Sequence, residues 1–133
     1  MSFEAFRIHQ QEKDVRAGFE QLEVDDLTEG DVVIKAAYSC VNYKDALAAT
    51  STIKLIHEFP RVIGINVSGH VISSSDKRFR EGDEVLVTGY EFGIGHDGGY
   101  SEYCRVPADW VVPLPKKMSL FNAMAIGTAG YTA

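Results

Sequence analysis

The fold is decided by the stretch VVIKAAYSC, residues 32–40, in which apolar side chains recur at every second position. In an extended chain, one face would carry the apolar members and the other face the polar ones. The first face holds Val32, Ile34, Ala36, Tyr38 and Cys40, and the second holds Lys35 and Ser39. A period of two is the signature of a half-buried strand, so we expect a strand here with its first face in the core.

Similar short runs lie on both sides of this stretch. Strands are expected over residues 3–8, 18–24, 66–73, 84–88, 100–106 and 110–114, with 18–24 as the hairpin partner of 3–8. Residues 50–61 are expected to form a loop. One short helix is expected from Asn42, and another from a Ser119 cap to residue 126. Many short strands with tight turns and few helices predict a mainly β protein folded as a partly open barrel.

Composition excludes several function classes. The chain has 133 residues, of which 45% are hydrophobic and 24% charged, as expected for one soluble globular domain. Its net charge of −6 and the absence of a basic stripe argue against nucleic-acid binding. The charged N-terminus and the absence of a run of ~20 apolar residues argue against export and against a membrane role. We therefore expect a cytoplasmic protein with reduced cysteines.

Residues 93–98, GIGHDG, match the spacing G-x-G-x-x-G of the dinucleotide-binding fingerprint and follow an expected strand. That fingerprint requires a helix immediately afterwards, whose N-terminal amides face a pyrophosphate. Here the next residues, 100–106, have the pattern of a strand. We therefore interpret residues 89–99 as a flexible loop between two strands.

The sequence offers no metal-ligand pattern. Its histidines do not fall at ligand spacings with each other or with cysteine; they are His9, His57, His70 and His96. His70 lies inside an expected strand and is interpreted as an ordinary polar residue, and Cys40 and Cys104 are interpreted as core thiols.

Residues 38–47, YSCVNYKDAL, allow two interpretations. In the first, which is purely structural, Asn42 caps a helix, Asp45 supports the cap and Tyr43 packs. This explains less well why Tyr43 and Lys44, two large side chains with polar tips, occupy the first turn. In the second interpretation these side chains have a functional role, and the residues alone leave both open.

Five segments together resemble the quinone-oxidoreductase-like branch of the medium-chain dehydrogenase/reductase superfamily, and most of all its bacterial acrylyl-CoA reductase group. They are NYKDAL (42–47), FPRVIGINVSG (59–69), GGYSEY (98–103), DWVVPLP (109–115) and GTAGYTA (127–133). The resemblance covers essentially the whole chain. It implies a GroES-like catalytic domain over residues 1–126. Residues 127–133 would then begin the connection to an NADP-binding Rossmann domain that is missing here.

The resemblance also implies a zinc-independent enzyme. Zinc-dependent relatives carry a Cys ligand near the first helix and a Gly-His-Glu ligand motif further on. The matching stretches here are Val41–Asp45 and Gly64–Asn66, and neither holds Cys or His. One departure from the family's pattern is Asn66, where an acidic residue is usual; the amide keeps a hydrogen-bonding tip but loses the charge.

As an activity, the resemblance implies NADPH-dependent reduction of an activated alkene, of the type acrylyl-CoA to propionyl-CoA. Tyr43 would contact the nicotinamide cofactor, and Thr128 at the domain junction would also reach it. Asn42 and Lys44 are candidates for orienting the nicotinamide or stabilising the enolate. Tyr90 and His96 are weaker candidates for the substrate pocket.

The partners implied are a small molecule, either an acyl-CoA thioester or a quinone, and a second subunit in a homodimer of the full-length protein. Two alternatives remain open. One is a quinone or enone reductase on the same scaffold. The other is a barrel that binds a partner and catalyses nothing, although a helical pattern that stops without a cap at Ala133 argues against it.

Overall fold

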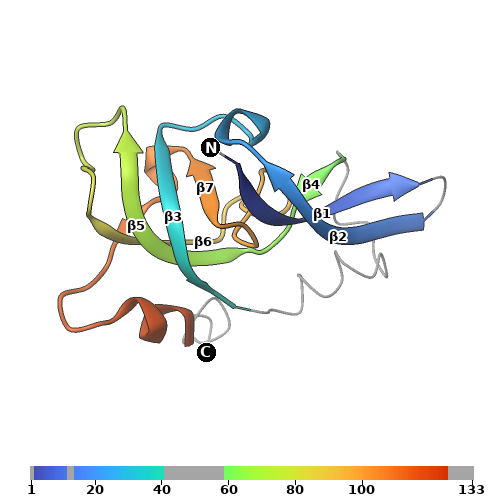
Figure 1. Ribbon diagram of the computed structural model, residues 1–133. Coiled ribbons are helices and arrows are strands. Elements are labelled where there is room, and N and C mark those ends of the chain that lie inside the picture. Colours follow the sequence, from blue (N-terminus) through green and yellow to red (C-terminus); the bar gives the residue numbers. More distant parts are fainter. Residues whose placement is uncertain (1, 12–13, 41–58, 126–133) are drawn as a thin grey trace.

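The structure is a computed structural model that describes residues 2–11, 14–40 and 59–125. Its strands form two antiparallel sheets (Figure 1). The smaller sheet has the order β2-β1-β4, with β1 at Phe3–Gln11, β2 at Asp14–Leu22 and β4 at Arg61–Val62. The larger sheet has the order β7-β3-β5-β6-β8. Its strands are β7 at Tyr103–Val106, β3 at Val32–Ser39, β5 at Asn66–Ser74, β6 at Glu84–Thr88 and β8 at Val112–Pro113. The prediction of a mainly β fold is confirmed.

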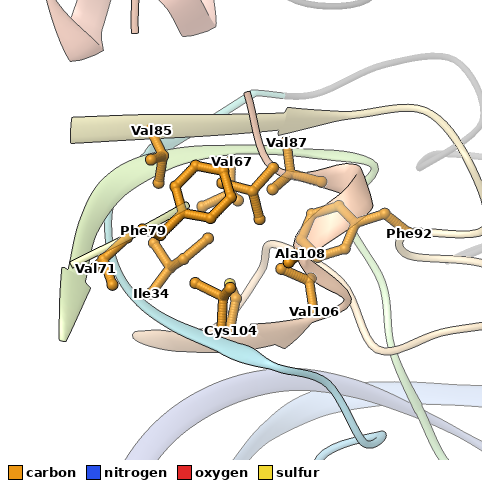
Figure 2. Packing of buried hydrophobic residues seen from close by; sticks show 12 residues of the cluster. Ile34, Val67, Val71, Phe79, Val85, Val87, Phe92, Cys104, Val106 and Ala108 are labelled. Atoms are coloured by element: carbon orange, nitrogen blue, oxygen red, sulfur yellow. The ribbon is translucent and has the colours of Figure 1, made fainter. Parts of the chain in front are cut away.

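The main core lies inside the curve of the larger sheet. Alternate residues of its strands are buried: Val32 and Ile34 in β3, Val85 and Val87 in β6, and Cys104 in β7. Figure 2 shows these side chains converging with the rings of Phe79 and Phe92, which are contributed by loops. The period of two predicted for residues 32–40 therefore places the core correctly at Val32 and Ile34.

The smaller sheet is joined to the larger by the segment that precedes β7. The amide of Phe6 donates to the carbonyl of Tyr100 (2.7 Å), and the amide of Glu102 donates to the carbonyl of Glu4 (3.0 Å). Between them, Ala5 and Ser101 form an isolated bridge. The segment 100–102 thus pairs with β1, and the chain then continues into β7, which pairs with β3. This segment therefore connects the two sheets.

One expected core position is wrong. Tyr38, which the alternation placed on the buried face of residues 32–40, is 46% exposed. The β3–β5 register shifts between Ala36 and Tyr38, so the second half of the strand no longer follows the period of the first. The Tyr38 ring lies edge-on to Phe121, 5.5 Å between centroids, at the surface.

Several element boundaries also differ from expectation. Residues 50–61 are expected to form a loop, but the last of them, Arg61, belongs to β4 and pairs with Ile8 of β1. The hairpin strand β2 begins at Asp14 rather than residue 18, and β7 begins at Tyr103 rather than residue 100. Trp110 belongs to a 3₁₀ helix, Ala108–Trp110, and only Val112–Pro113 of the expected strand 110–114 is extended in a sheet.

The expected Ser119 cap is present. The Ser119 hydroxyl accepts a hydrogen bond from the amide of Asn122 (3.0 Å), and residues 120–125 are helical. A further 3₁₀ helix, Val24–Asp26, was not foreseen. The helix expected from Asn42 lies outside the described residues. Within the described part of the chain, no helix is long and apolar enough to span a membrane.

Candidate functional site

Three segments meet at Cys40, the residue that follows β3. The Tyr100 hydroxyl donates a hydrogen bond to the Cys40 carbonyl oxygen (3.0 Å), and the Asn66 side-chain amide donates to the Cys40 sulfur. Tyr100 and Asn66 are 60 and 26 residues away in sequence. We refer to Cys40, Asn66 and Tyr100 as the Cys40 junction. It lies two residues before Asn42, the first of the candidate site residues.

Asn66 reaches this junction from the start of β5, opposite Thr88 of β6. Its side chain is fully buried, in a run of apolar neighbours, and a buried amide of this kind requires hydrogen-bond partners. The backbone of Gly99 packs directly on it, since a Cβ there would lie 2.3 Å from the Asn66 carbonyl oxygen. Asn66 is therefore held in place from the sheet and from the neighbouring loop.

Tyr100 is fixed by both its backbone and its ring. Its amide donates to the Ile63 carbonyl (3.0 Å), and its carbonyl accepts from Phe6. The ring lies against Gly64, where a Cβ would come within 2.6 Å of a ring carbon. Gly64 also has φ +104°, a conformation that favours glycine, so this position suits glycine on two grounds.

A groove open to solvent, of about 680 Å³, runs beside the junction. Its walls include four aromatic rings from β1, β2, β3 and the loop before β7: Phe6, Phe19, Tyr38 and Tyr100. Two acidic residues, Glu4 and Glu102, also line it, and its described lining includes no Lys or Arg. Such a surface suits an uncharged planar group better than a phosphate, because the carboxylates repel anions.

Tyr90 and His96 both contact a different ring, Trp110. Tyr90 stacks on Trp110 with 5.5 Å between centroids, and His96 meets it edge-on at 4.9 Å. Tyr90 is 66% exposed and has a positive φ of 55°, whereas His96 is buried and its Nε2 lies 2.7 Å from the Arg105 carbonyl oxygen. Burial lowers the pKa of His96, which the bond to Arg105 offsets only in part. Neither residue lines the groove.

The loop that carries the fingerprint spacing is packed into the fold rather than flexible. Its amides at Gly98 and Gly99 donate to Val62 and Gly64 (2.8 Å each), and no helix follows. Added Cβ atoms at Gly93 and Gly98 would lie 2.4 and 2.3 Å from the Gly64 carbonyl oxygen. These glycines allow close contact between backbones of the same domain, so the interpretation that the match is not a nucleotide site is supported.

Four of the predicted site residues, Asn42, Tyr43, Lys44 and Thr128, lie outside the described residues. The sequence analysis noticed Asn66 only as a departure from a family pattern and did not single out Tyr100. A signal for Asn66 was available, because a strand that begins with a buried amide needs a partner. The signal for Tyr100 was weaker: an aromatic residue after two glycines, at a point where backbones approach closely.

Across residues 2–11, 14–40 and 59–125, no three His, Cys, Asp or Glu side chains gather as potential metal ligands. Cys104 is buried, and burial raises the pKa of its thiol to about 12, so it is the core thiol that was predicted. Cys40 is only partly buried. The absence of zinc from the whole site stays a prediction, because the segment 41–58 is not described.

Residues 28–116 match the model of the alcohol dehydrogenase GroES-like domain family, and the chain belongs to this family. The predicted relationship to the medium-chain dehydrogenase/reductase superfamily is confirmed. Among curated proteins, the chain is 47% identical over 131 residues to "Putative quinone oxidoreductase YhfP" of Bacillus subtilis (strain 168). It is 46% identical over 118 residues to "Acrylyl-CoA reductase AcuI" of Ruegeria pomeroyi. These alignments cover 98% and 89% of this chain, but only 40% and 36% of the relatives.

Solved structures give the same picture. The yhdH oxidoreductase of Salmonella enterica, in complex with NADP, superposes with a TM-score of 0.95 at 46% identity. The yhfP protein of Bacillus subtilis, with NAD bound, superposes with a TM-score of 0.96 at 46% identity. The matches cover 97% and 99% of this chain and 40% of each of those chains. The chain therefore spans about two fifths of the length of these relatives.

Proposed function

We propose that this chain supplies the substrate-side domain of an NADPH-dependent, zinc-independent reductase of activated alkenes, of the type that converts acrylyl-CoA to propionyl-CoA. The observation that carries the proposal is the 46% identity to the acrylyl-CoA reductase of Ruegeria pomeroyi across 89% of the chain. The domain would comprise residues 1–126. Residues 127–133 would lead into a Rossmann domain, which accounts for the greater length of the relatives.

Among the described residues, the glycine-rich loop does not provide a site for the phosphates of such a cofactor. The described residues include no glycine-rich turn that opens a helix, and two of the three glycines at fingerprint spacing, Gly93 and Gly98, pack against Gly64 instead of leaving room for a pyrophosphate. In this proposal the phosphates are therefore bound by the Rossmann domain, and only the nicotinamide end approaches this chain. When bound, the cofactor supplies the hydride, while the protein supplies position and electrostatics.

The roles proposed for the chain's own residues follow from this division. Tyr43 contacts the nicotinamide end, and Thr128 contacts the cofactor from the domain junction. As the alkene is reduced, negative charge develops on the substrate's carbonyl oxygen, and Asn42 and Lys44 are the donors proposed to stabilise it. Tyr90 and His96 are proposed as walls of the substrate pocket.

The test uses the full-length enzyme with Tyr43→Phe and Tyr43→Ala. We expect Tyr43→Ala to weaken NADPH binding, measured by fluorescence titration, and to lower turnover of acrylyl-CoA. Tyr43→Phe separates the role of the ring from that of the hydroxyl. If both variants bind NADPH and reduce acrylyl-CoA as the wild type does, the role of Tyr43 is wrong.

A quinone is the second candidate substrate. It is supported by the 47% identity to YhfP and by the groove, which presents four aromatic rings and two carboxylates. A neutral planar ring suits that surface, whereas the phosphates of a CoA thioester would be repelled by Glu4 and Glu102. Side-by-side measurements of kcat/KM with acrylyl-CoA and a simple quinone separate the two candidates.

Zinc independence is tested by metal analysis of the purified full-length enzyme. We expect full activity after treatment with a chelator and less than stoichiometric zinc. One zinc per subunit that is lost together with activity would refute this part of the proposal. Sedimentation of the same sample tests the expected homodimer.

A further inference from the structure

We propose that the groove between the two sheets is a binding site for a planar organic cation, that is, an aromatic ring with a positive charge, such as a pyridinium or a quinolinium. The groove presents aromatic rings together with acidic residues, and all the residues that carry the proposal lie in the described part of the chain. The proposal goes beyond the reductase function, because it assigns the groove a preference for charge and does not depend on turnover.

One wall of the groove is a face of the paired strands β1 and β2. Side chains alternate across a strand, so Glu4 and Phe6 of β1 point to the same side, and Phe19 of β2 joins them from the position opposite Phe6. The rings of Phe6 and Phe19 meet edge-on, with 5.2 Å between centroids. Phe19 is 70% exposed, so a planar ligand placed against it would remove apolar surface from water.

Tyr100 contributes a third ring from the loop before β7. Its ring lies 6.3 Å from that of Phe6, again edge-on, and both pack against the buried cluster of Ile8 and Ile63. Backbone hydrogen bonds to Ile63 and Phe6 hold Tyr100 in place. These rings are thus fixed before any ligand binds, which lowers the entropic cost of binding.

A further part of the lining is the end of β3, where small side chains leave the groove open. Ala36 and Ala37 lie there, at the shift in the β3–β5 register, and Tyr38 follows with a largely exposed ring. The volume of about 680 Å³ is within the range of sites that hold one small molecule. The size of the groove therefore suits a small ligand rather than a protein partner.

The acidic residues determine the sign of charge that the groove favours. Glu4 and Glu102 line it, and the backbone amide of Glu4 donates to Oε1 of Glu102 (2.6 Å), which holds that carboxylate at the wall. The described lining includes no Lys or Arg to offset them, and the whole chain has a net charge of −6. A cation is attracted by the carboxylates through their charge and by an aromatic face through its quadrupole.

This combination distinguishes the classes of ligand. A neutral ring gains contact with the aromatic side chains but nothing from the acids, and an anionic ring is repelled by them. A compact ammonium ion is strongly hydrated and is too small to cover both Phe19 and Tyr38. Of these ligands, only a planar cation uses the rings and the acids together.

The test compares three ligands of the same bicyclic shape by calorimetric titration into the full-length protein near neutral pH. N-methylquinolinium is positively charged, quinoline is neutral and naphthoate is negatively charged. We expect N-methylquinolinium to bind at least ~5-fold more tightly than quinoline, and naphthoate to bind most weakly. Added salt should narrow the difference between the cation and the neutral ring, because it screens exposed charges.

Variants show whether the groove is the site. Glu102→Gln keeps an oxygen that can accept from the Glu4 amide and removes the charge. We expect Glu4→Gln and Glu102→Gln each to weaken N-methylquinolinium binding ~3-fold or more, with quinoline within about twofold of the wild type. Phe19→Leu removes an exposed ring and should weaken both ligands. The matched control, Glu81→Gln, removes an exposed acid outside the groove and should leave both affinities unchanged.

Two results would overturn the proposal. One is equal affinity of the wild type for the cation and the neutral ring. The other is a preference for the cation that persists in Glu4→Gln and Glu102→Gln, when circular dichroism and Tm show that both are folded. The proposed function fails separately, through a wild type that neither binds NADPH nor reduces acrylyl-CoA or a quinone, and that result leaves the titrations with N-methylquinolinium valid.

Discussion

The carboxylate of Asp97 lies 3.4 Å from Nη1 of Arg61, and the two side chains are only 8% and 6% exposed. The same carboxylate accepts hydrogen bonds from the backbone amides of Val62 (2.9 Å) and Thr28 (3.0 Å). Arg61 also donates to the Thr28 hydroxyl (2.9 Å). One buried charge therefore joins the glycine-rich loop, β4 and the turn before β3.

Asp97→Asn should destabilise the domain strongly. The substitution removes the negative charge beside the buried Arg61 guanidinium, and loss of one partner from a buried pair typically costs about 3–5 kcal/mol. Denaturant unfolding measures the change. The control is Asp109→Asn, which removes an exposed partner of Arg78 and should cost no more than about 1 kcal/mol. Equal effects of the two substitutions would contradict the role of Asp97.

His96 should make stability depend on pH on the acid side of neutrality. Burial lowers its pKa in the folded protein below the usual value for histidine, about 6.5. The unfolded chain therefore binds the proton first as the pH falls, and the free energy of unfolding decreases below about pH 6.5, whereas it is fully retained above that pH.

His96→Gln, which cannot titrate, should flatten the dependence of Tm on pH in that range. His70→Gln, which removes an exposed imidazole from β5, is the control. Parallel curves for the wild type and His96→Gln would contradict the assignment.

Two strand glycines in different environments should respond differently to substitution by alanine. A Cβ at Gly69 would lie 2.1 Å from the Lys35 carbonyl oxygen, inside the β3–β5 ladder, whereas one at Gly18 in β2 meets nothing within 4 Å. We expect Gly69→Ala to cost about 1–3 kcal/mol or to prevent folding, and Gly18→Ala to change stability by no more than about 0.5 kcal/mol. Thermal unfolding of the two variants checks this difference.

Tyr90→Ala tests both the stacking and the pocket proposal. Trp110 is the only tryptophan, and removal of the stacked ring should expose it and shift its emission to longer wavelength. If Tyr90 also lines the substrate pocket, kcat/KM for acrylyl-CoA falls while the KM for NADPH is unchanged. A shift in emission with unaltered kinetics would confine Tyr90 to packing.

The strands could be predicted where alternation persisted. Val32 and Ile34 in β3 are buried as their spacing indicated, and the strand expected over residues 84–88 is present as β6. The prediction failed at Tyr38, because a register shift in the ladder leaves no mark on the local pattern. It missed β4 because two residues, Arg61 and Val62, are too few to show any period.

Candidate site residues could be proposed from the sequence only where they lie close together in the chain, and the roles of residues 42–44 stay predictions. Asn42, Tyr43 and Lys44 stood out because large polar-tipped side chains occupy an expected first helical turn. The contacts of Cys40 with Asn66 and Tyr100 join residues far apart in the chain, and these partners become evident only when the sheets are assembled. In the glycine-rich loop, a short local pattern was misleading on its own. Its spacing matches that of a nucleotide site, but Gly93 and Gly98 accommodate the backbone of Gly64.

The pairing between Glu4 and Glu102 has a consequence for synthesis of the chain. Their backbones are joined in the finished fold, but 98 residues separate them. At a translation rate of about 5–20 residues per second, the ribosome needs roughly 5 to 20 seconds to pass from one to the other. During that interval the Glu4–Phe6 part of β1 has not yet met its partner, and such an open edge invites pairing with another nascent chain. Although β1 is the first strand to be synthesised, the hydrogen bonds of Glu4 and Phe6 with residues 100–102 are thus among the last to form.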